Sequence, residues 1–253
     1  MANNFIHFSD VMLHDPMTWQ GKKILSFDVD WASDEVLSYC LDTIQSANIP
    51  ATFMMTHETP LLNRMCSMPN IELGIHPNFN PLIESTDSGK TAQGILEDLL
   101  ALVPEAQVLR AHSLTHSGRW LGLYEKLGLK YTSNYCMLGV ETIQPFLHVN
   151  SVIECPHYFA DDAFLFRSSN GTPEEWDTRL QSNTFNGLRV FNFHPIHVAL
   201  NSDSLERYES SRSNHRDWNT LQPYRHKGYG VERLLETLLS SARSGMNASP
   251  LSP

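Results

Sequence analysis

Short apolar runs alternate with amphipathic stretches through the first half of the chain. Residues 23–27 and 51–55 are compact apolar segments of the kind that form buried strands. Between them, Ser33 suits a helix N-cap, and the stretch after it carries apolar residues at helical spacing. This order of strand and helix is typical of parallel α/β architecture.

The alternation continues to about residue 133. We expect further strands at 71–75, 108–111 and 130–133, and helical segments at 60–65, 91–103 and 118–127. Pro104 and Gly128 follow the last two helices, where residues that stop a helix are expected.

The second half of the chain is less regular. Residues 188–193 form a clear buried strand, and residues 231–239 predict a closing helix with one apolar stripe. Residues 201–230 show no apolar period, so we expect a long functional loop there. Because no repeat or linker is visible, we predict a single domain over residues 1–240 and a disordered tail at 241–253.

Composition narrows the class of partner. The chain has 253 residues, of which 41% are hydrophobic and 18% charged, enough for a substantial core. Its net charge of −10, without a basic block, argues against nucleic acid or an anionic membrane as the main partner. We read no secretion signal and no apolar run long enough to span a bilayer, and we therefore expect a cytoplasmic protein without a membrane span. The oligomeric state is left open.

The four cysteines form no CxxC pair, so reduced and mostly buried thiols are expected rather than a zinc ribbon. Other polar residues recur at one structural place, the carboxyl end of a predicted strand. These residues are Asp28, Asp30, His76, Asn80, Arg110, His112, His116, His194 and His197. In a parallel α/β barrel these ends converge on one face, where active sites are built, so we expect a shared site.

Several motifs resemble one known family. The segments SFDVDW (26–31), GIHPNFN (74–80), then Arg110 and FHP (193–195) occur in the order of the polysaccharide deacetylases. That family is carbohydrate esterase family 4, with the nodulation-protein-B-like domain, and the likeness is closest to its WbmS-like branch, encoded with O-antigen enzymes. The resemblance covers nearly the whole chain. It implies a distorted (β/α)7 barrel and metal-dependent removal of an acyl group from a sugar.

The resemblance also implies a role for each matching residue. Asp30 and His76 match metal ligands, Asp28 matches the catalytic base, and Arg110 matches the arginine that holds this base. His194 matches the histidine that protonates the departing nitrogen. These roles suit amide hydrolysis, which needs an activated water, stabilisation of an oxyanion and an acid for the leaving amine.

One departure from the family pattern concerns the metal. The second metal histidine, four residues after the first, is Asn80 here. A neutral amide oxygen is a poorer zinc ligand than imidazole, so zinc would bind less tightly or another divalent ion would be tolerated. Alternatively, His112, His116 or His197 supplies the missing nitrogen.

Further residues are candidates for substrate binding. His112, His116 and His197 are expected as polar lining, and Asp161 with Asp162 stands where the family carries a buried acid that orients the site. Trp218 and Tyr224, in the long polar segment, are candidates for stacking on sugar rings.

Plainer interpretations remain beside these roles. Asp28 and Asp30 also suit helix capping. His76 and Asn80 also suit a turn.

Together these features predict a cytoplasmic, metal-dependent hydrolase that removes an N-acetyl or N-formyl group from a sugar in surface-polysaccharide or O-antigen biosynthesis. The expected cofactor is a divalent ion, most simply zinc. The expected substrate is an acylated amino sugar that is nucleotide-linked, lipid-linked or at the end of a glycan. The alternatives are a catalytically weak carbohydrate-binding relative and a hydrolase of another non-peptide C–N bond.

Overall fold

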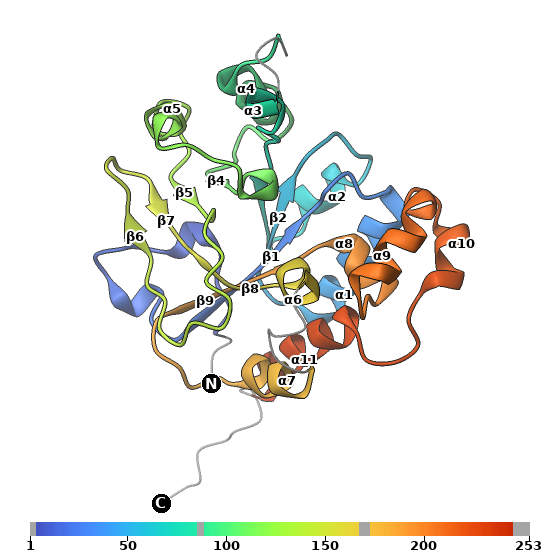
Figure 1. Cartoon of the computed structure of the whole chain (residues 1–253). Helices are drawn as coiled ribbons and strands as arrows, with labels where there is room; N and C mark the ends of the chain where they lie inside the picture. The colour runs from blue at the N-terminus through green and yellow to red at the C-terminus, as the bar shows by residue number, and fades with distance from the viewer. Residues whose placement is uncertain (1–3, 85–88, 167–172, 245–253) are drawn as a thin grey trace, which may run out of the picture.

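Among the residues that the structure describes, nine strands form one sheet at the centre of the molecule (Figure 1). The computed structural model describes residues 4–84, 89–166 and 173–244. The strand order is β6-β7-β5-β4-β3-β2-β1-β9-β8, and every neighbouring pair is parallel except β6 with β7. The strands are β1 (Lys22–Asp28), β2 (Ala51–Met55), β3 (Ile71–Ile75), β4 (Val108–Leu109), β5 (Tyr131–Thr132), β6 (Phe146–Leu147), β7 (Ile153–Glu154), β8 (His157–Ala160) and β9 (Leu188–Phe193).

Helices connect the strands and cover the sheet. They are α1 (Asp34–Ala47), α2 (Leu62–Ser67), α3 (Pro81–Glu84), α4 (Ala92–Leu102), α5 (Leu121–Lys126), α6 (Asp161–Phe166), α7 (Pro173–Gln181), α8 (Pro195–Leu200), α9 (Leu205–Ser211), α10 (Trp218–Leu221) and α11 (Val231–Ser244). Helix α1 begins where the sequence indicates, because the Ser33 hydroxyl accepts a hydrogen bond from the Val36 N–H at 3.4 Å.

The sheet curls until its two sides meet. Residues 135–139, which follow β5, hydrogen-bond to β8: the His157 N–H donates to the Tyr135 carbonyl at 2.9 Å, and the Met137 N–H donates to the His157 carbonyl at 2.9 Å. Seven strands therefore surround one interior, with β6 and β7 as an antiparallel extension outside them. This arrangement confirms the predicted α/β class and distorted (β/α)7 barrel.

Alternation along β1 separates a polar from an apolar face. Phe27 faces the helices and stacks on Phe53 with ring centroids 4.7 Å apart. Ser26 and Asp28 point the opposite way, into the barrel, because successive strand residues face opposite sides. The register of β1 with β9 sets Asn192 beside Ser26, so polar side chains of two strands meet inside the barrel.

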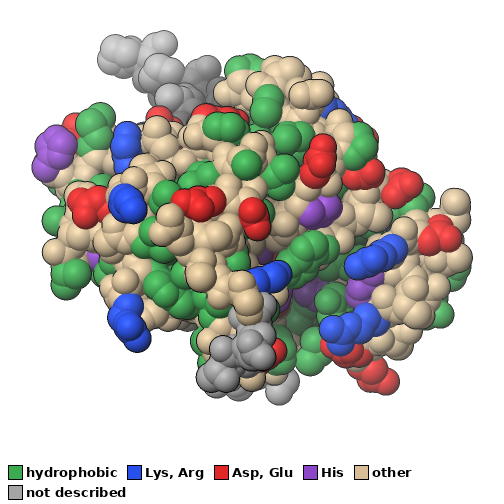
Figure 2. Space-filling model, turned by 90° about the horizontal axis from the view of Figure 1, so that it is seen from above, with side chains coloured by type: hydrophobic (Ala, Val, Ile, Leu, Met, Phe, Trp, Pro, Cys, Tyr) green, Lys and Arg blue, Asp and Glu red, His purple; other side chains and the backbone are tan. Residues whose placement is uncertain are grey.

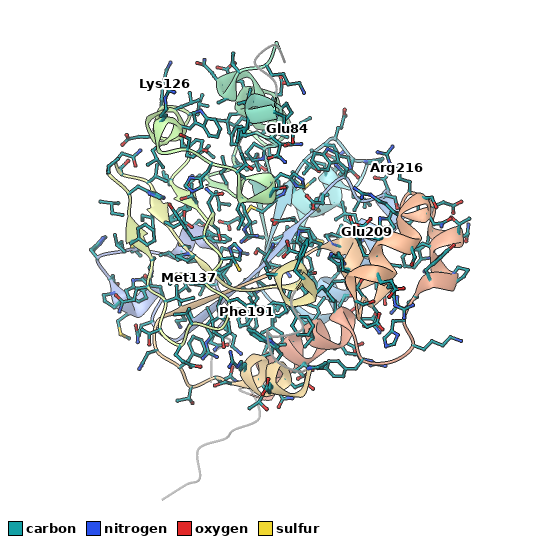
Figure 3. All side chains as sticks on the ribbon, in the orientation of Figure 1. Glu84, Lys126, Met137, Phe191, Glu209 and Arg216 are labelled. Atoms are coloured by element: carbon teal, nitrogen blue, oxygen red, sulfur yellow. The ribbon has the colours of Figure 1, made fainter. Side chains whose placement is uncertain are left out.

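Below these polar residues the barrel interior is apolar. Strand residues Ile24, Met54 and Val190 form this floor together with side chains from the N-terminal segment, Phe8, Val11 and Trp19 among them. The packing is close: a Cβ atom on Gly74 would lie 2.9 Å from the Val108 carbonyl, so only glycine fits there. Figure 3 shows side chains filling the molecule, with Phe191 in its interior and Glu84 and Lys126 at the periphery.

The second half of the chain corrects two sequence predictions. Residues 201–230 are not one long loop, because α9 and α10 lie within them, each with a capping side chain, Ser204 or Asp217. Both helices are too short to show an apolar period. Helix α11 continues to Ser244, so a disordered tail is wrong for residues 241–244; residues 245–253 lie outside the described residues. The single-domain boundary at residue 240 stays a prediction.

The surface carries mixed charge. On the face seen in Figure 2, acidic and basic side chains are interspersed, and several histidines lie among apolar side chains. Within the described ranges, no helix combines the length and the apolar content that crossing a bilayer requires.

We predict that stability depends on pH through one buried lysine. Burial, with the neighbouring Arg189 charge, lowers the pKa of Lys23 to about 7, while its Nζ donates to the Leu180 carbonyl at 3.0 Å. Between pH 7 and 10.5 the unfolded chain binds a proton at this position that the folded chain does not, so stability rises with pH. Relative to Lys23→Met, the wild type should gain up to about 1.4 kcal/mol per pH unit in this window.

Chemical denaturation of both proteins at pH 7 and pH 9 measures this difference. Comparing the two proteins removes the contribution of other groups that titrate in the same range. A difference in the free energy of unfolding that is the same at both pH values would contradict the lowered pKa of Lys23.

Candidate functional site

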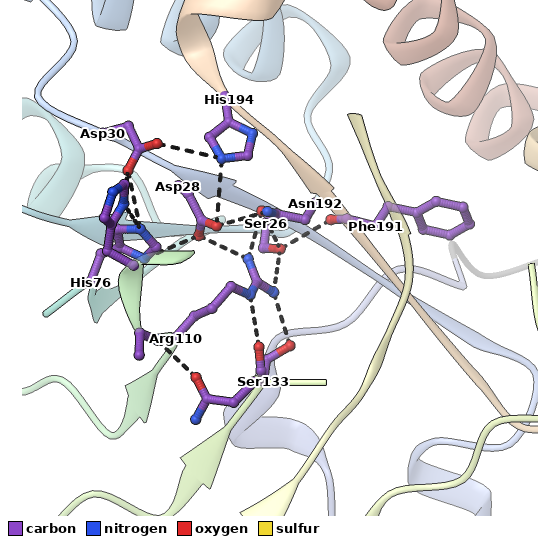
Figure 4. A network of polar contacts seen from close by, with 12 residues as sticks. Ser26, Asp28, Asp30, His76, Arg110, Ser133, Phe191, Asn192 and His194 are labelled. Atoms are coloured by element: carbon purple, nitrogen blue, oxygen red, sulfur yellow. Dashed lines mark hydrogen bonds and ion pairs between the residues drawn. The ribbon is translucent and has the colours of Figure 1, made fainter. Parts of the chain in front are cut away.

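Arg110 lies at the centre of the polar layer inside the barrel (Figure 4). Its guanidinium donates to Asp28 Oδ1 at 2.9 Å, to Asn192 Oδ1 at 2.6 Å and to the Ser26 hydroxyl at 3.0 Å. Two further bonds reach the carbonyl and the hydroxyl of Ser133, at 3.0 and 2.9 Å. Every nitrogen of this fully buried side chain therefore has a partner, as a buried charge requires.

Asp28, the last residue of β1, is 3% exposed and held from two sides. Arg110 contacts one carboxylate oxygen, and the Asn192 side-chain amide donates to the other at 2.7 Å. Burial raises the pKa of Asp28, but the positive charges of Arg110, His76 and His194 together outweigh it, and the net pKa lies below the ordinary value. Asp28 is therefore an oriented carboxylate that is ionised at neutral pH.

Asp30, His76 and His112 form a compact triangle of possible metal ligands. Asp30 Oδ1 lies 3.1 Å from His76 Nε2 and 2.9 Å from His112 Nδ1, and the two nitrogens are 3.3 Å apart. Ligand atoms at roughly 2.0–2.1 Å from a tetrahedral zinc ion are separated by about 3.3 Å, so these three atoms fit one such ion. Burial opposes ionisation of Asp30, but hydrogen bonds from His112 and His76 hold its pKa below the ordinary value.

The backbone is strained where it presents these ligands. Asp30 and Trp31 are consecutive left-handed residues, with φ of 45° and 55°. Directly after His112, Ser113 and Leu114 repeat this conformation with φ of 55° and 53°. Left-handed backbone costs a non-glycine residue roughly 1–2 kcal/mol, and such strain concentrates at functional sites.

His194 follows β9 and faces both acids of the first motif. Its Nε2 lies 3.6 Å from Asp30 and 3.9 Å from Asp28, while its Nδ1 contacts Asp161 at 2.6 Å. Asp161 also accepts the backbone N–H of His194 at 2.8 Å, which fixes the ring's position. Burial alone would lower the pKa of His194, but the Asp161 carboxylate raises it well above the ordinary value. The imidazolium form is thus favoured, with Nε2–H toward the two acids.

A small cavity of about 120 Å³ joins these groups. Part of its wall consists of small side chains, Ala111, Cys136, Ala160 and Ala163. His157 also lines the cavity; burial, with the nearby Arg110 charge, lowers its pKa to about 3, so it is neutral. One side of the cavity is therefore lined by charged groups, and another side is lined mainly by small, uncharged side chains.

Asn80 and His116, two of the metal-ligand candidates predicted from the sequence, lie outside the cavity wall. The Asn80 side-chain oxygen accepts a hydrogen bond from the Thr115 hydroxyl at 2.6 Å, and its amide donates to Ser113. His116 packs edge-on against Tyr135. Neither is among the described residues that line the cavity. His112, by contrast, lies within the ligand triangle.

The remaining expected residues divide between the cavity and its surroundings. Asp162 lines the cavity, and burial raises its pKa, but Asp161 rather than Asp162 contacts His194. His197 is buried on α8 beside His194 and bonds to Ser202 at 3.1 Å. Trp218 packs against Tyr39, with ring centroids 5.3 Å apart, rather than along the described cavity wall.

Several residues of the polar layer are not among those predicted from the sequence. Asn192, Ser26 and Ser133 all bond to Arg110, and His157 lines the cavity. A signal exists for two of them: Ser26 stands two residues before Asp28, and Asn192 stands two before His194, so strand alternation places each on the same face as its neighbour.

Comparison with known proteins shows the family of the chain. The model of the WbmS-like polysaccharide deacetylase family matches residues 25–212. A crystal structure from Bordetella bronchiseptica, assigned as a polysaccharide deacetylase involved in O-antigen biosynthesis, is 35% identical, with a TM-score of 0.84 over 94% of this chain and 98% of that one. Another assigned polysaccharide deacetylase, from Mycobacterium smegmatis, is 14% identical, with a TM-score of 0.47 over 96% of this chain and 97% of that one. No curated protein matches the sequence.

We predict that Arg110 is required for stability as well as for the site. Arg110→Met leaves the buried Asp28 carboxylate without its cation and should lower the free energy of unfolding by about 3–5 kcal/mol. Adding Asp28→Asn to that variant removes the unpaired charge and should recover part of the loss. Urea denaturation measures both effects.

Arg233→Met serves as the control, because Arg233 pairs with Glu236 on the exposed side of α11 and should change stability little. Equal stability of Arg110→Met and the wild type would show that the buried network is not needed for the fold.

Proposed function

The chain belongs to the WbmS-like polysaccharide deacetylases, hydrolases of non-peptide C–N bonds, and we propose that it removes a short N-acyl group from an amino sugar with a divalent metal ion. The observation that carries the proposal is the grouping of an ionised carboxylate, a three-atom ligand triangle and an acid-paired histidine around one cavity. We propose Asp30, His76 and His112 as the residues that hold the ion. His112 then takes the role of third ligand that the family pattern assigns to the position of Asn80. Zinc is the ion that one carboxylate and two imidazoles suit best.

Each protein group has a distinct task in this scheme. A divalent ion bound there would act as a Lewis acid, lowering the pKa of water and polarising the acyl carbonyl. Asp28 accepts a proton from the attacking water, while Arg110 and Asn192 hold its carboxylate in place and ionised.

His194 acts on the opposite side of the bond. Its Nδ1–H is directed to Asp161, so its Nε2–H is available to the nitrogen that leaves. The C–N bond breaks, a C–O bond forms, and the products are a carboxylate and a free amine.

The dimensions of the cavity support a short acyl group. A volume of about 120 Å³, with three alanines in its wall, suits an acetyl or formyl group better than a long chain. By likeness to the Bordetella protein, we propose that the amino sugar belongs to O-antigen or related surface-glycan biosynthesis, as a nucleotide-linked, lipid-linked or glycan-terminal residue. A cytoplasmic location remains a prediction.

The direct test is release of acetate or formate from a panel of N-acylated amino sugars. Asp28→Asn should lower the turnover number at least about 100-fold, because it removes the base while keeping the shape of the side chain. Enzymatic detection of the released acid measures the rate, and circular dichroism checks that the variant is folded. Turnover by Asp28→Asn equal to that of the wild type would overturn the role assigned to Asp28.

Metal content tests the ligand assignment independently of activity. His112→Ala should lose most of the metal that the wild type retains on purification without chelator. Asn80→Ala, the matched control, should keep it, because the Asn80 oxygen is bonded to Thr115. Elemental analysis measures the stoichiometry.

The opposite pattern, with metal lost from Asn80→Ala and kept by His112→Ala, would restore Asn80 as the ligand. A wild type that binds no metal but still binds sugar would support a carbohydrate-binding relative instead.

A further inference from the structure

Trp31 stands beside the proposed metal ligands without being buried by the fold. It directly follows Asp30, the residue is 40% exposed, and its ring meets His112 edge-on with centroids 5.1 Å apart. Asp30, which precedes Trp31 in the chain, and His112, which Trp31 contacts, both line the cavity. Trp31 is thus an aromatic surface at the edge of the site.

The backbone holds Trp31 there in a conformation that favours glycine. Its φ is 55°, which is rare for a bulky residue, and its N–H donates to the Thr56 hydroxyl at 3.2 Å. Thr56 is itself bonded to His57 Nδ1 at 2.8 Å. A large side chain that is 40% exposed gains less from burial than a core tryptophan, and its strained backbone points to a role outside the folding of the chain.

The other tryptophans contrast with Trp31. Trp19 lies in the barrel floor, and Trp176 is fully buried. Trp120 packs on Phe79 at 4.4 Å, and Trp218 packs on Tyr39 at 5.3 Å. Of the five tryptophans in the chain, Trp31 alone combines an exposed indole with contact to a residue that lines the cavity.

We propose that Trp31 is the platform on which the reacting sugar ring stacks, with its acyl group directed into the cavity beside His112. This inference rests on the proposed function. An indole presents a flat apolar face that matches the C–H face of a pyranose, and the ring is already oriented by His112 and by the backbone. Trp31 then positions the substrate and takes no part in proton transfer.

Trp31→Gly tests this role with the smallest risk of misfolding. Glycine suits the left-handed backbone, so the variant should melt no lower than Trp31→Ala. We expect KM for the N-acylated amino sugar to rise at least tenfold in Trp31→Gly while kcat changes less than threefold and metal content stays the same. Trp31→Phe, which keeps an aromatic face, should fall between Trp31→Gly and the wild type.

Phe146→Ala is the control, since Phe146 is similarly exposed, at 42%, but lies on β6 outside the seven-stranded ring. Its kinetic constants should match those of the wild type. An unchanged KM in Trp31→Gly would refute the platform and leave the proposed function intact. Loss of metal together with a fall in kcat would equally refute it, because Trp31 would then serve to orient His112.

A wild type that hydrolyses none of the sugars would defeat the proposed function separately. The platform is then judged by calorimetric binding of the same sugars. At least tenfold weaker binding to Trp31→Gly would uphold it, and equal binding, or none to the wild type, would refute it.

Discussion

The buried ion pair of Arg110 with Asp28 is the interaction on which the site depends. Removing two charges from water costs several kcal/mol for each ion, and this cost is offset only when hydrogen bonds satisfy both groups. Here Ser26, Ser133 and Asn192 accept the remaining hydrogen bonds of the Arg110 guanidinium. These groups come from β1, from β9 and from the residues that directly follow β4 and β5, so the network also ties the two halves of the barrel together.

Much of the fold could be predicted from the sequence because the chain is locally consistent. Apolar runs such as 51–55 and 71–75 coincide with β2 and β3, and Ser33 caps α1 as its position indicates. The gathering of Asp28, His76, Arg110 and His194 follows from one rule, that the carboxyl ends of parallel strands share a face. The family likeness, confirmed by the match over residues 25–212, supplied the distorted barrel.

The remaining features depend on contacts that no local pattern encodes. The family likeness suggested Asn80 as a ligand candidate, but only the folded chain reveals that Thr115 donates to its oxygen and that His112 lies 2.9 Å from Asp30. His112 and His116 do not share a helix face, because Ser113 and Leu114 are left-handed. The short helices α9 and α10 left no visible period, and the closure of the barrel by residues 135–139 passes through a segment without strand character.

The position of β1 between β2 and β9 has a consequence for how the molecule is made. β2 follows β1 closely in sequence, but the bond from Ser26 to Phe191 spans 165 residues. High contact order slows folding, since the entropy of closing a long loop is lost before the contact forms. During synthesis, the acidic end of β1 therefore lacks its β9 partners until β9 emerges. The proposed catalytic centre is then among the last parts of the protein to form, and an incomplete chain exposes the charges of β1 without their partners.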